Sequence, residues 1–358
     1  MANIETKMKI SIVFITILSF LLSCIQEAKD NTVFIDLNNC AEKLTYSQFV
    51  KRIDYITLNL GDTNLLTGIK KIFFDQDTII IQDSRKEGIF LFTSGGQFVR
   101  RINRKGQGPE EYLSDNAVAV DTVLNRIYVY DMMNFKIMEY NYTGHFLAGH
   151  KMAYFIRDFA KTDTSDFVMI QPCIHHAYPN NGIWKYSLKE GLSRQFLSYP
   201  EQKDQNFEFI STYIVQAPDF VYYYDRNTDC LYQIGSDSLV EMYSIDLKQV
   251  LPLQARWQAM PKKQELEGKA MLYDFSVSSN HVLLNYFLFE ENHPYRYVLI
   301  NRKNPTSPAI YRTLTNDLDD KVSSENKIYY VNDSTWCKLV DYADNDTSIQ
   351  LQLLHLIK

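Results

Sequence analysis

Short apolar runs recur along the chain at a regular spacing, and each is followed by a polar turn. Three stretches align well: "TIIIQDSRKEGIFLFTSGGQFVRRI" from Thr78, "RIYVYDMMNFKIMEYNYTGHFLAGH" from Arg126 and "FVYYYDRNTDCLYQIGSDSLVEMYS" from Phe220. In each, the first run ends in an aspartate, at Asp83, Asp131 and Asp225. These aspartates are 48 and then 94 residues apart, so the period is about 47 with one degenerate unit between. The pattern predicts a repeat protein.

Each repeat contains four predicted strands, because a further apolar run precedes each stretch. Examples are "GIKKIFF" from Gly68 and "NAVAVDT" from Asn116. Four short strands in about 47 residues are typical of a propeller blade. Six units fit between Gly68 and the C-terminus, so the prediction is an all-β, six-bladed β-propeller spanning residues 32–358. Glycines in "SGG" (94–96) and "YTG" (142–144) are expected to adopt positive φ in hairpin turns.

The last unit is one strand short, which raises the question of how the ring closes. An N-terminal strand could supply the missing one, either "TVFIDL" (32–37) or "DYITLNL" (54–60). Closure of this kind would remove the open edges that all-β proteins must protect.

Residues 247–272 interrupt the pattern. They are rich in helix formers, poor in β-branched residues and contain Pro261. We expect a helical insertion between the fourth and fifth blades, serving either as packing against one face or as a lid or docking element.

The N-terminus has the features of an export signal. Two lysines precede the apolar run Ile10–Leu22, which is too short to cross ~30 Å of hydrocarbon as a helix. The run closes on Leu21-Leu22-Ser23-Cys24, which resembles a bacterial lipobox. We therefore expect residues 1–23 to be a lipoprotein signal peptide, Cys24 to be acylated and residues 24–31 to be a tether. The expected location is the cell envelope, as an outer-membrane lipoprotein facing either the periplasm or the cell surface.

Composition narrows the class of partner. The chain has 358 residues and a formal net charge of −6 without a long basic run, which argues against nucleic acid. Its 25 tyrosines and 21 phenylalanines favour β-structure, as inter-sheet packing or as a sugar-binding platform. Four cysteines follow Cys24, without CxxC spacing; we expect free thiols rather than disulfides or zinc ligands at these positions: Cys40, Cys173, Cys230 and Cys337.

The loop Ile102–Ser114, "INRKGQGPEEYLS", contains two closely spaced glycines. It lacks the Lys-Ser/Thr of a P-loop, and a strand rather than a helix follows it, so nucleotide binding is not expected. Its place in the repeat makes it the joint between blades one and two. We expect Gly106 and Gly108 to supply unusual backbone angles, and Pro109 to stiffen the turn.

This loop also carries a family resemblance. Tyr55–Phe146 resembles a family of six-bladed propeller lipoproteins from gut anaerobes, whose hallmark is a G-x-G-P-x-E-Y loop after the first blade. Ile102–Phe146 in addition resembles the NHL-type repeat. The resemblance implies the propeller fold and the lipid anchor, and it implies no reaction.

Candidate binding residues follow from propeller geometry, since joint loops share a face with the loops between second and third strands. Adjacent strand residues point oppositely, so the pair at 175–176 is not expected to ligate one metal. The recurring aspartates are expected to cap turns through their own backbone. The candidates for the binding face are Arg104, Lys105, His175, His176, Tyr178, Glu290, Glu291 and His293.

No hydrolase, metalloprotease, EF-hand or cysteine-nucleophile motif occurs in the sequence. The leading hypothesis is therefore a membrane-anchored binding module with a protein or glycan partner and no cofactor. The alternative is a lactonase-like or lyase-like propeller enzyme with a divalent metal in the central channel. Polar inner-strand residues such as Asp158 or Lys161 could line that channel.

Overall fold

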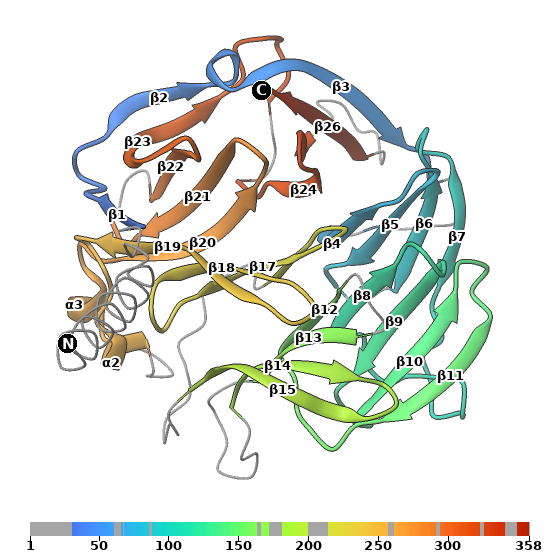
Figure 1. Ribbon diagram of the computed structural model, residues 1–358. Coiled ribbons are helices and arrows are strands. Elements are labelled where there is room, and N and C mark those ends of the chain that lie inside the picture. The colour runs from blue at the N-terminus through green and yellow to red at the C-terminus, as the bar shows by residue number, and fades with distance from the viewer. Residues whose placement is uncertain are drawn as a thin grey trace, which may run out of the picture.

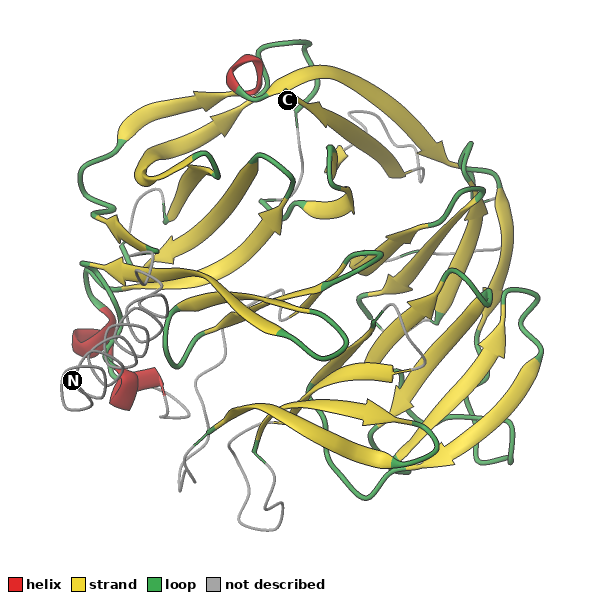
Figure 2. Cartoon of the chain, viewed as in Figure 1, coloured by secondary structure: helices red, strands yellow, loops and turns green. Residues whose placement is uncertain are grey.

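The computed structural model confirms an all-β propeller of six blades around a central axis (Figure 1). It describes residues 31–60, 66, 68–85, 88–162, 166–171, 181–199, 214–256, 261–290, 294–322, 326–340 and 349–357. Strands dominate the described part of the chain, and its helical segments are short (Figure 2). The helical segments are η1 (Tyr46–Gln48), α2 (Leu253–Arg256) and α3 (Lys263–Leu266).

The first three blades each consist of four consecutive antiparallel strands. Blade one contains β4 (Ile69–Phe74), β5 (Thr78–Asp83), β6 (Ile89–Thr93) and β7 (Phe98–Ile102). Blade two contains β8 (Ala117–Asp121), β9 (Arg126–Asp131), β10 (Lys136–Asn141) and β11 (Phe146–Lys151). Blade three contains β12 (Asp158–Lys161), β13 (Asp166–Gln171), β14 (Gly182–Ser187) and β15 (Gly191–Ser198).

The other three blades all include a strand from the N-terminal segment. Blade four contains β16 (Ile214–Gln216), β17 (Val221–Asp225), β18 (Cys230–Ile234), β19 (Leu239–Leu247) and, outermost, β1 (Thr32–Ile35). Blade five contains β20 (Ala270–Val277), β21 (His281–Leu288), β22 (Tyr295–Asn301), β23 (Asn304–Thr315) and β2 (Ala41–Thr45). Blade six contains β24 (Tyr329–Asn332), β25 (Thr335–Val340), β26 (Ile349–Leu356) and β3 (Val50–Leu58).

The N-terminal segment 32–58 forms a belt around half of the ring, visible in blue along the rim in Figure 1. Strands β1 and β2 add in parallel to β19 and β23, whereas β3 pairs antiparallel with β26 and completes blade six. Of the two stretches predicted to close the ring, the one containing Asp54–Leu58 does so. The other, at Thr32–Ile35, instead becomes a fifth strand on blade four.

Polar contacts fasten the turn between β1 and β2 to blades four and five. The Leu37 amide donates to Gln249 Oε1 (2.9 Å), and Arg296 Nε donates to the Leu37 carbonyl (3.3 Å). Asp36 accepts from Lys248 Nζ (2.7 Å) and Gln249 Nε2 (2.6 Å). Hydrogen bonds from these two side chains hold the pKa of Asp36 at about 2, below its usual 3.8.

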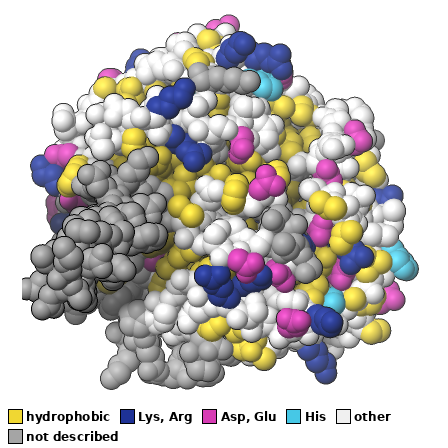
Figure 3. Space-filling model, in the orientation of Figure 1, with side chains coloured by type: hydrophobic (Ala, Val, Ile, Leu, Met, Phe, Trp, Pro, Cys, Tyr) yellow, Lys and Arg dark blue, Asp and Glu magenta, His cyan; other side chains and the backbone are white. Residues whose placement is uncertain are grey.

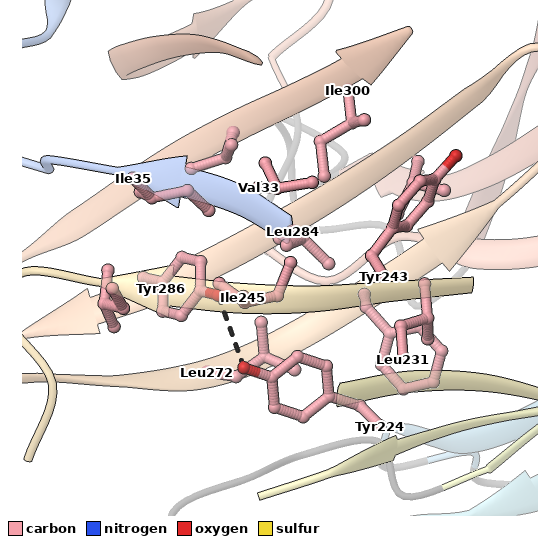
Figure 4. Packing of buried hydrophobic residues seen from close by; sticks show 14 of the residues in the cluster. Val33, Ile35, Tyr224, Leu231, Tyr243, Ile245, Leu272, Leu284, Tyr286 and Ile300 are labelled. Carbon is pink, nitrogen blue, oxygen red and sulfur yellow. Dashed lines mark hydrogen bonds between the residues drawn. The ribbon is translucent and has the colours of Figure 1, made fainter. Parts of the chain in front are cut away.

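Apolar side chains of the belt also enter the core between blades four and five. Val33 and Ile35 are 0% and 2% exposed and pack beside Ile245 of β19 (Figure 4). Burial of each such side chain stabilises the fold by about 1.5–3 kcal/mol. In the same cluster the hydroxyls of Tyr224 and Tyr286 lie 3.4 Å apart and link the two blades.

The joint between blades one and two is a packed loop, and the reason for its glycines differs from the prediction. Neither Gly106 nor Gly108 has a positive φ. The glycines make room for the Glu111 carboxylate, which accepts from the Gly108 amide (2.8 Å). A Cβ on Gly106 would lie 1.9 Å from Glu111 Oε2. By contrast, Gly96 and Gly144 do adopt positive φ, 84° and 75°, as predicted.

Tyr112 anchors the same loop in the core. Its side chain is 0% exposed, its amide donates to the Arg104 carbonyl (2.9 Å), and its ring meets Tyr140 of blade two edge-on at 6.3 Å between centroids. Pro109 lies in the turn preceding Glu111. The motif thus joins two neighbouring blades through one buried tyrosine.

The three recurring aspartates each accept hydrogen bonds from the turn that follows. Asp83 accepts from the Arg85 amide (2.7 Å), and Asp225 from the Asn227 amide (3.0 Å). Asp131 accepts from the amide of Met133 (3.1 Å) and also from the joint loop, through the Leu113 amide (3.0 Å). Burial alone would raise the pKa of Asp131, but hydrogen bonds from the Leu113 amide, Asn134 and Ser114 outweigh it and lower the pKa.

The predicted insertion is narrower than residues 247–272. Leu247 ends β19 and Ala270 begins β20, and between them the helices among the described residues are α2 and α3. Arg256 of α2 is buried and bonds Asp229 of blade four (2.6 Å from Nη2 to Oδ2) and the Leu251 carbonyl (2.7 Å). This buried ion pair holds α2 against blade four.

The close approach at Gly106 generates a prediction. We expect Gly106→Ala to destabilise the protein by about 1–3 kcal/mol, because the added methyl displaces the Glu111 carboxylate. In a Glu111→Ala background the same substitution should cost much less, since the clash is gone. Urea unfolding of the four variants of this cycle measures both values. Gly95→Ala, whose Cβ would meet nothing closer than 3.8 Å, is the control. Additive effects at positions 106 and 111 would contradict the explanation.

Candidate functional site

The inner strands of the blades surround a cavity of about 240 Å³ at one end of the central channel. Its lining comes from the starts of β4, β12 and β16, from residues just before β8 and β24, and from the loop between β9 and β10. All of these lie at the ends of the blades that carry the joint loops and the loops between second and third strands. The cavity therefore lies on the face where the sequence analysis expected ligands.

Basic side chains dominate the charged part of the lining. Lys70, Lys71, Arg157 and Lys327 are set against one carboxylate among the described lining residues, Asp158. The chain as a whole carries a net charge of −6, whereas basic side chains outnumber acidic ones among the described residues that line the cavity. On the face seen in Figure 3, basic and acidic side chains are intermixed.

A β-bulge explains how two adjacent lysines reach the same cavity. In a regular strand, neighbouring side chains point to opposite faces. In β4 the register against β5 shifts between Ile69, opposite Asp83, and Lys71, opposite Gln82. Lys70 is the extra residue, and a bulge of this kind re-aims the side chains beside it. Both lysines therefore line the mouth.

Lys71 and Asp158, which both line the cavity, form an ion pair. Their Nζ and Oδ1 atoms are 2.5 Å apart, with side-chain exposures of 17% and 7%. Lys71 Nζ also donates to the carbonyls of Val118 (3.2 Å) and Phe159 (3.4 Å). The three ammonium protons thus meet three acceptors on blades two and three, and the pair ties blade one to both.

Lys327 and Lys70 bridge the sixth, first and second blades through carbonyl groups. Lys327 Nζ donates to the Lys70 carbonyl (2.9 Å), and its ammonium lies 4.8 Å from the centre of the Tyr329 ring. Lys70 Nζ in turn donates to the carbonyl of Asn116. Backbone carbonyls of neighbouring blades thus accept hydrogen bonds from both ammonium groups.

Apolar side chains form the remaining wall. Met132, Phe155, Ile156 and Ile214 line the cavity beside the cations. A smaller cavity of about 50 Å³ shares both β4 lysines, Ile214 and Lys327 and continues along β4, β16 and β24. The two cavities therefore adjoin each other in the space between the inner strands.

The predicted candidate residues lie elsewhere, as far as the structure describes them. Arg104 and Lys105 are exposed and do not line the cavity; Arg104 Nη2 donates to the Gly144 carbonyl (3.4 Å). Glu290 Oε2 lies 3.2 Å from Nη2 of the buried Arg296, the residue that holds the belt at Leu37. The other candidates lie outside the described residues, namely Cys24, His175, His176, Tyr178, Glu291 and His293.

The inner-strand residues named from the sequence are both buried. Asp158 lines the mouth, whereas Lys161, at the other end of β12, lies 3.6 Å from Asp121 Oδ2 and over the Phe167 ring. Sequence reasoning missed the β4 lysines and Lys327. Two consecutive lysines at the start of an inner strand were the available sign.

The described residues contain no group of three or more His, Cys, Asp or Glu side chains placed to hold a metal ion. Cys40, Cys230 and Cys337 are free thiols, and Cys173 lies outside the described part. Burial raises the pKa of the Cys337 thiol. Within the described part of the chain, no helix has the length and apolar character needed to cross a membrane.

Fold and site together define a six-bladed propeller with a cation-lined channel mouth. A family model described as "Domain of unknown function (DUF4934)" matches residues 32–351, so the chain belongs to that family. Among curated proteins, none matches.

Two solved structures share the fold. One is described as a "Putative exported protein" from Bacteroides fragilis NCTC 9343, with a TM-score of 0.69 at 15% identity over 92% of this chain and 99% of that one. The other is a member of the duf4221 family from Bacteroides vulgatus, with a TM-score of 0.53 at 10% identity over 86% and 98%. The family match and the shared fold confirm the predicted resemblance to a propeller family. The NHL-like repeat and the lipoprotein character stay predictions.

Proposed function

We propose that this protein is a lipid-anchored propeller of the cell envelope that binds a ligand at the mouth of its central channel. The anchor is supported by the apolar run Ile10–Leu22 closing on Cys24. The word "exported" in the description of the Bacteroides fragilis structure agrees with this location. Protein and glycan partners, presented outside the cytoplasm, are the expected ligands.

The cavity at the mouth is the observation that carries the binding function. It lies on the face formed by joint loops, on a scaffold whose strands fix the positions of its walls. Its volume of about 240 Å³ is below the ~300–1,000 Å³ of sites for drug-sized ligands. The site therefore suits a small molecule or one end group of a larger glycan or peptide.

The charged groups at the mouth favour binding over metal-dependent catalysis. A divalent metal in the channel would need several carboxylate, amide or imidazole ligands directed at one point. Asp158 is instead bonded to Lys71, and three further basic side chains line the same cavity. Those charges repel a metal cation, so the enzyme hypothesis receives no support from this lining.

The anchor can be tested at Cys24. We expect Cys24→Ala to abolish labelling by a radioactive fatty acid and to move the protein from the membrane fraction to the soluble fraction, because the acyl chains supply the membrane affinity. Cys40→Ala, at a partly exposed cysteine of the propeller, is the matched control and should change neither. Unchanged labelling of Cys24→Ala would refute the anchor.

The binding site can be tested by filling it. We expect Met132→Trp to abolish binding to an array of neutral and acidic glycans and to peptidoglycan fragments, because the indole occupies the cavity. Met133→Trp is the matched control: Met133 is the next residue, is 62% exposed and does not line the cavity. Binding that survives Met132→Trp, or an array and fragment set on which the native protein binds nothing, would count against this function.

A further inference from the structure

Large apolar side chains are exposed on the face of the propeller opposite the channel mouth. Val123 and Leu124 are 85% and 55% exposed in the turn between β8 and β9, and Phe220 is 37% exposed in the turn between β16 and β17. These inner strands run to the turns from the cavity, which Asn116 and Ile214 line. Because a strand rises about 3.3 Å per residue, the five residues of β8 carry its turn roughly 17 Å from the cavity. We call Val123, Leu124 and Phe220 the apolar tips.

The two strands that carry the apolar tips meet at the ends remote from the mouth. Gln216 Nε2, at the end of β16, donates to the Val120 carbonyl near the end of β8 (2.6 Å). The turn after β8 is itself fixed, since Asp121 Oδ1 accepts from the amides of Val123 (3.0 Å) and Leu124 (2.9 Å). Ordered turns therefore present the tips side by side.

Apolar residues in neighbouring exposed turns call for an explanation. Exposed turns favour Gly, Asn, Asp, Ser and Pro, which bend the chain or bond its backbone. Valine and leucine do neither, and in the turn between β8 and β9 they occur in succession. Single exposed apolar side chains are ordinary, whereas contiguous ones mark contact with a protein or a membrane. The apolar tips therefore form an interaction surface.

The start of the belt points to the membrane as the partner. Before β1, the Asn31 carbonyl accepts from the Ser244 amide (3.2 Å), and Asn31 Nδ2 donates to the Glu241 carbonyl (3.4 Å). Asn31 thus lies along β19 on the side that leads back to the turn between β18 and β19. In that turn, a Cβ on Gly235 would lie 3.8 Å from Cδ1 of Phe220. The first described residue of the belt therefore lies toward the end of blade four that carries a tip.

An acyl anchor at Cys24 would keep this end of the propeller close to the bilayer. Eight residues separate Cys24 from Thr32, and they span at most about 29 Å when fully extended. The ligand cavity lies at the opposite end of the inner strands. With the apolar tips against the bilayer, the mouth faces away from it and stays open to ligands.

We infer that the apolar tips contact the lipid bilayer, so that the acylated propeller lies with the face opposite the channel mouth against the membrane. This inference rests on the proposed lipid anchor and specifies how the anchored protein is oriented. The contact is driven by removal of apolar surface from water. Attraction to anionic headgroups does not contribute at Phe220, because its neighbour Asp219 is acidic and exposed.

Hydroxyl-radical footprinting tests the inference on the native side chains. The acylated chain is oxidised in phosphatidylcholine vesicles, and the Cys24→Ala chain in solution gives the reference. We expect oxidation of Leu124 and Phe220 to fall at least about threefold in the vesicles, because lipid covers these side chains. Met133, which follows β9 at the mouth end of the same blade as Leu124, is the internal control and should be oxidised equally in both samples.

A double substitution assigns the contact to the tips. We expect Val123→Glu combined with Leu124→Glu in the acylated chain to abolish the protection of Phe220, since carboxylates resist transfer into lipid. Both side chains are exposed and their amides can still bond Asp121, so the fold should survive; thermal unfolding checks this. Met133→Glu adds a carboxylate to the same blade at the mouth end and should leave the protection of Phe220 unchanged.

The outcomes separate this inference from the proposed anchor. If the acylated chain is bound to the vesicles but the tips are oxidised as in solution, the inference is wrong and the anchor stands. Protection of Met133 in place of the tips would mean that the mouth faces the membrane, which also contradicts the inference. Tips that become protected in solution as the protein concentration rises would be covered by a second copy rather than by lipid. If the chain with Cys24 intact does not bind the vesicles, the anchor and the inference both fall.

Discussion

The pairing of β3 with β26 is the interaction on which the ring depends. Among the described residues, the C-terminal part of the chain gives three strands to blade six, so without β3 the outer edge at β26 would expose unpaired backbone groups. The register runs from Ile349 opposite Leu58 to Leu356 opposite Val50, and it joins segments about 300 residues apart in sequence. Strands β1 and β2 precede β3 and pair with blades four and five. The chain is therefore already attached to the ring before it reaches the closing strand.

The site follows from the same closure. The inner strands begin around one point only if the blades form a complete ring. Lys327, which precedes β24 of blade six, donates a hydrogen bond to the Lys70 carbonyl of blade one, where the two ends of the ring meet. Lys71 then reaches Asp158 of blade three. The charged side chains of the mouth therefore come from three blades, and their arrangement depends on the belt. Glu290 acts on the belt as well, through Arg296 and Leu37, although the sequence placed it among binding residues.

The fold could be predicted from sequence because the blades repeat a similar spacing of apolar runs, and three of them share an aspartate at one position of the repeat, at 83, 131 and 225. The choice between two closing strands could not be made, since both stretches are apolar and their partners are non-local. The lysines at the channel mouth could not be predicted from the sequence for a different reason. Strict alternation places Lys70 and Lys71 on opposite faces, and only the bulge in β4 brings both to the cavity. Gly106 was explained by backbone angle, whereas its true constraint is the nearby Glu111 carboxylate.

Native-state hydrogen exchange tests the closure most directly, because it reports the opening free energy of each strand separately in the intact protein. If β3 holds the ring together, amides of β3 and β26 should exchange only with global unfolding, at the same free energy as those of the buried strands β5 and β9. Exchange of β3 through a local opening of clearly lower free energy, with blades one and two still protected, would contradict this account.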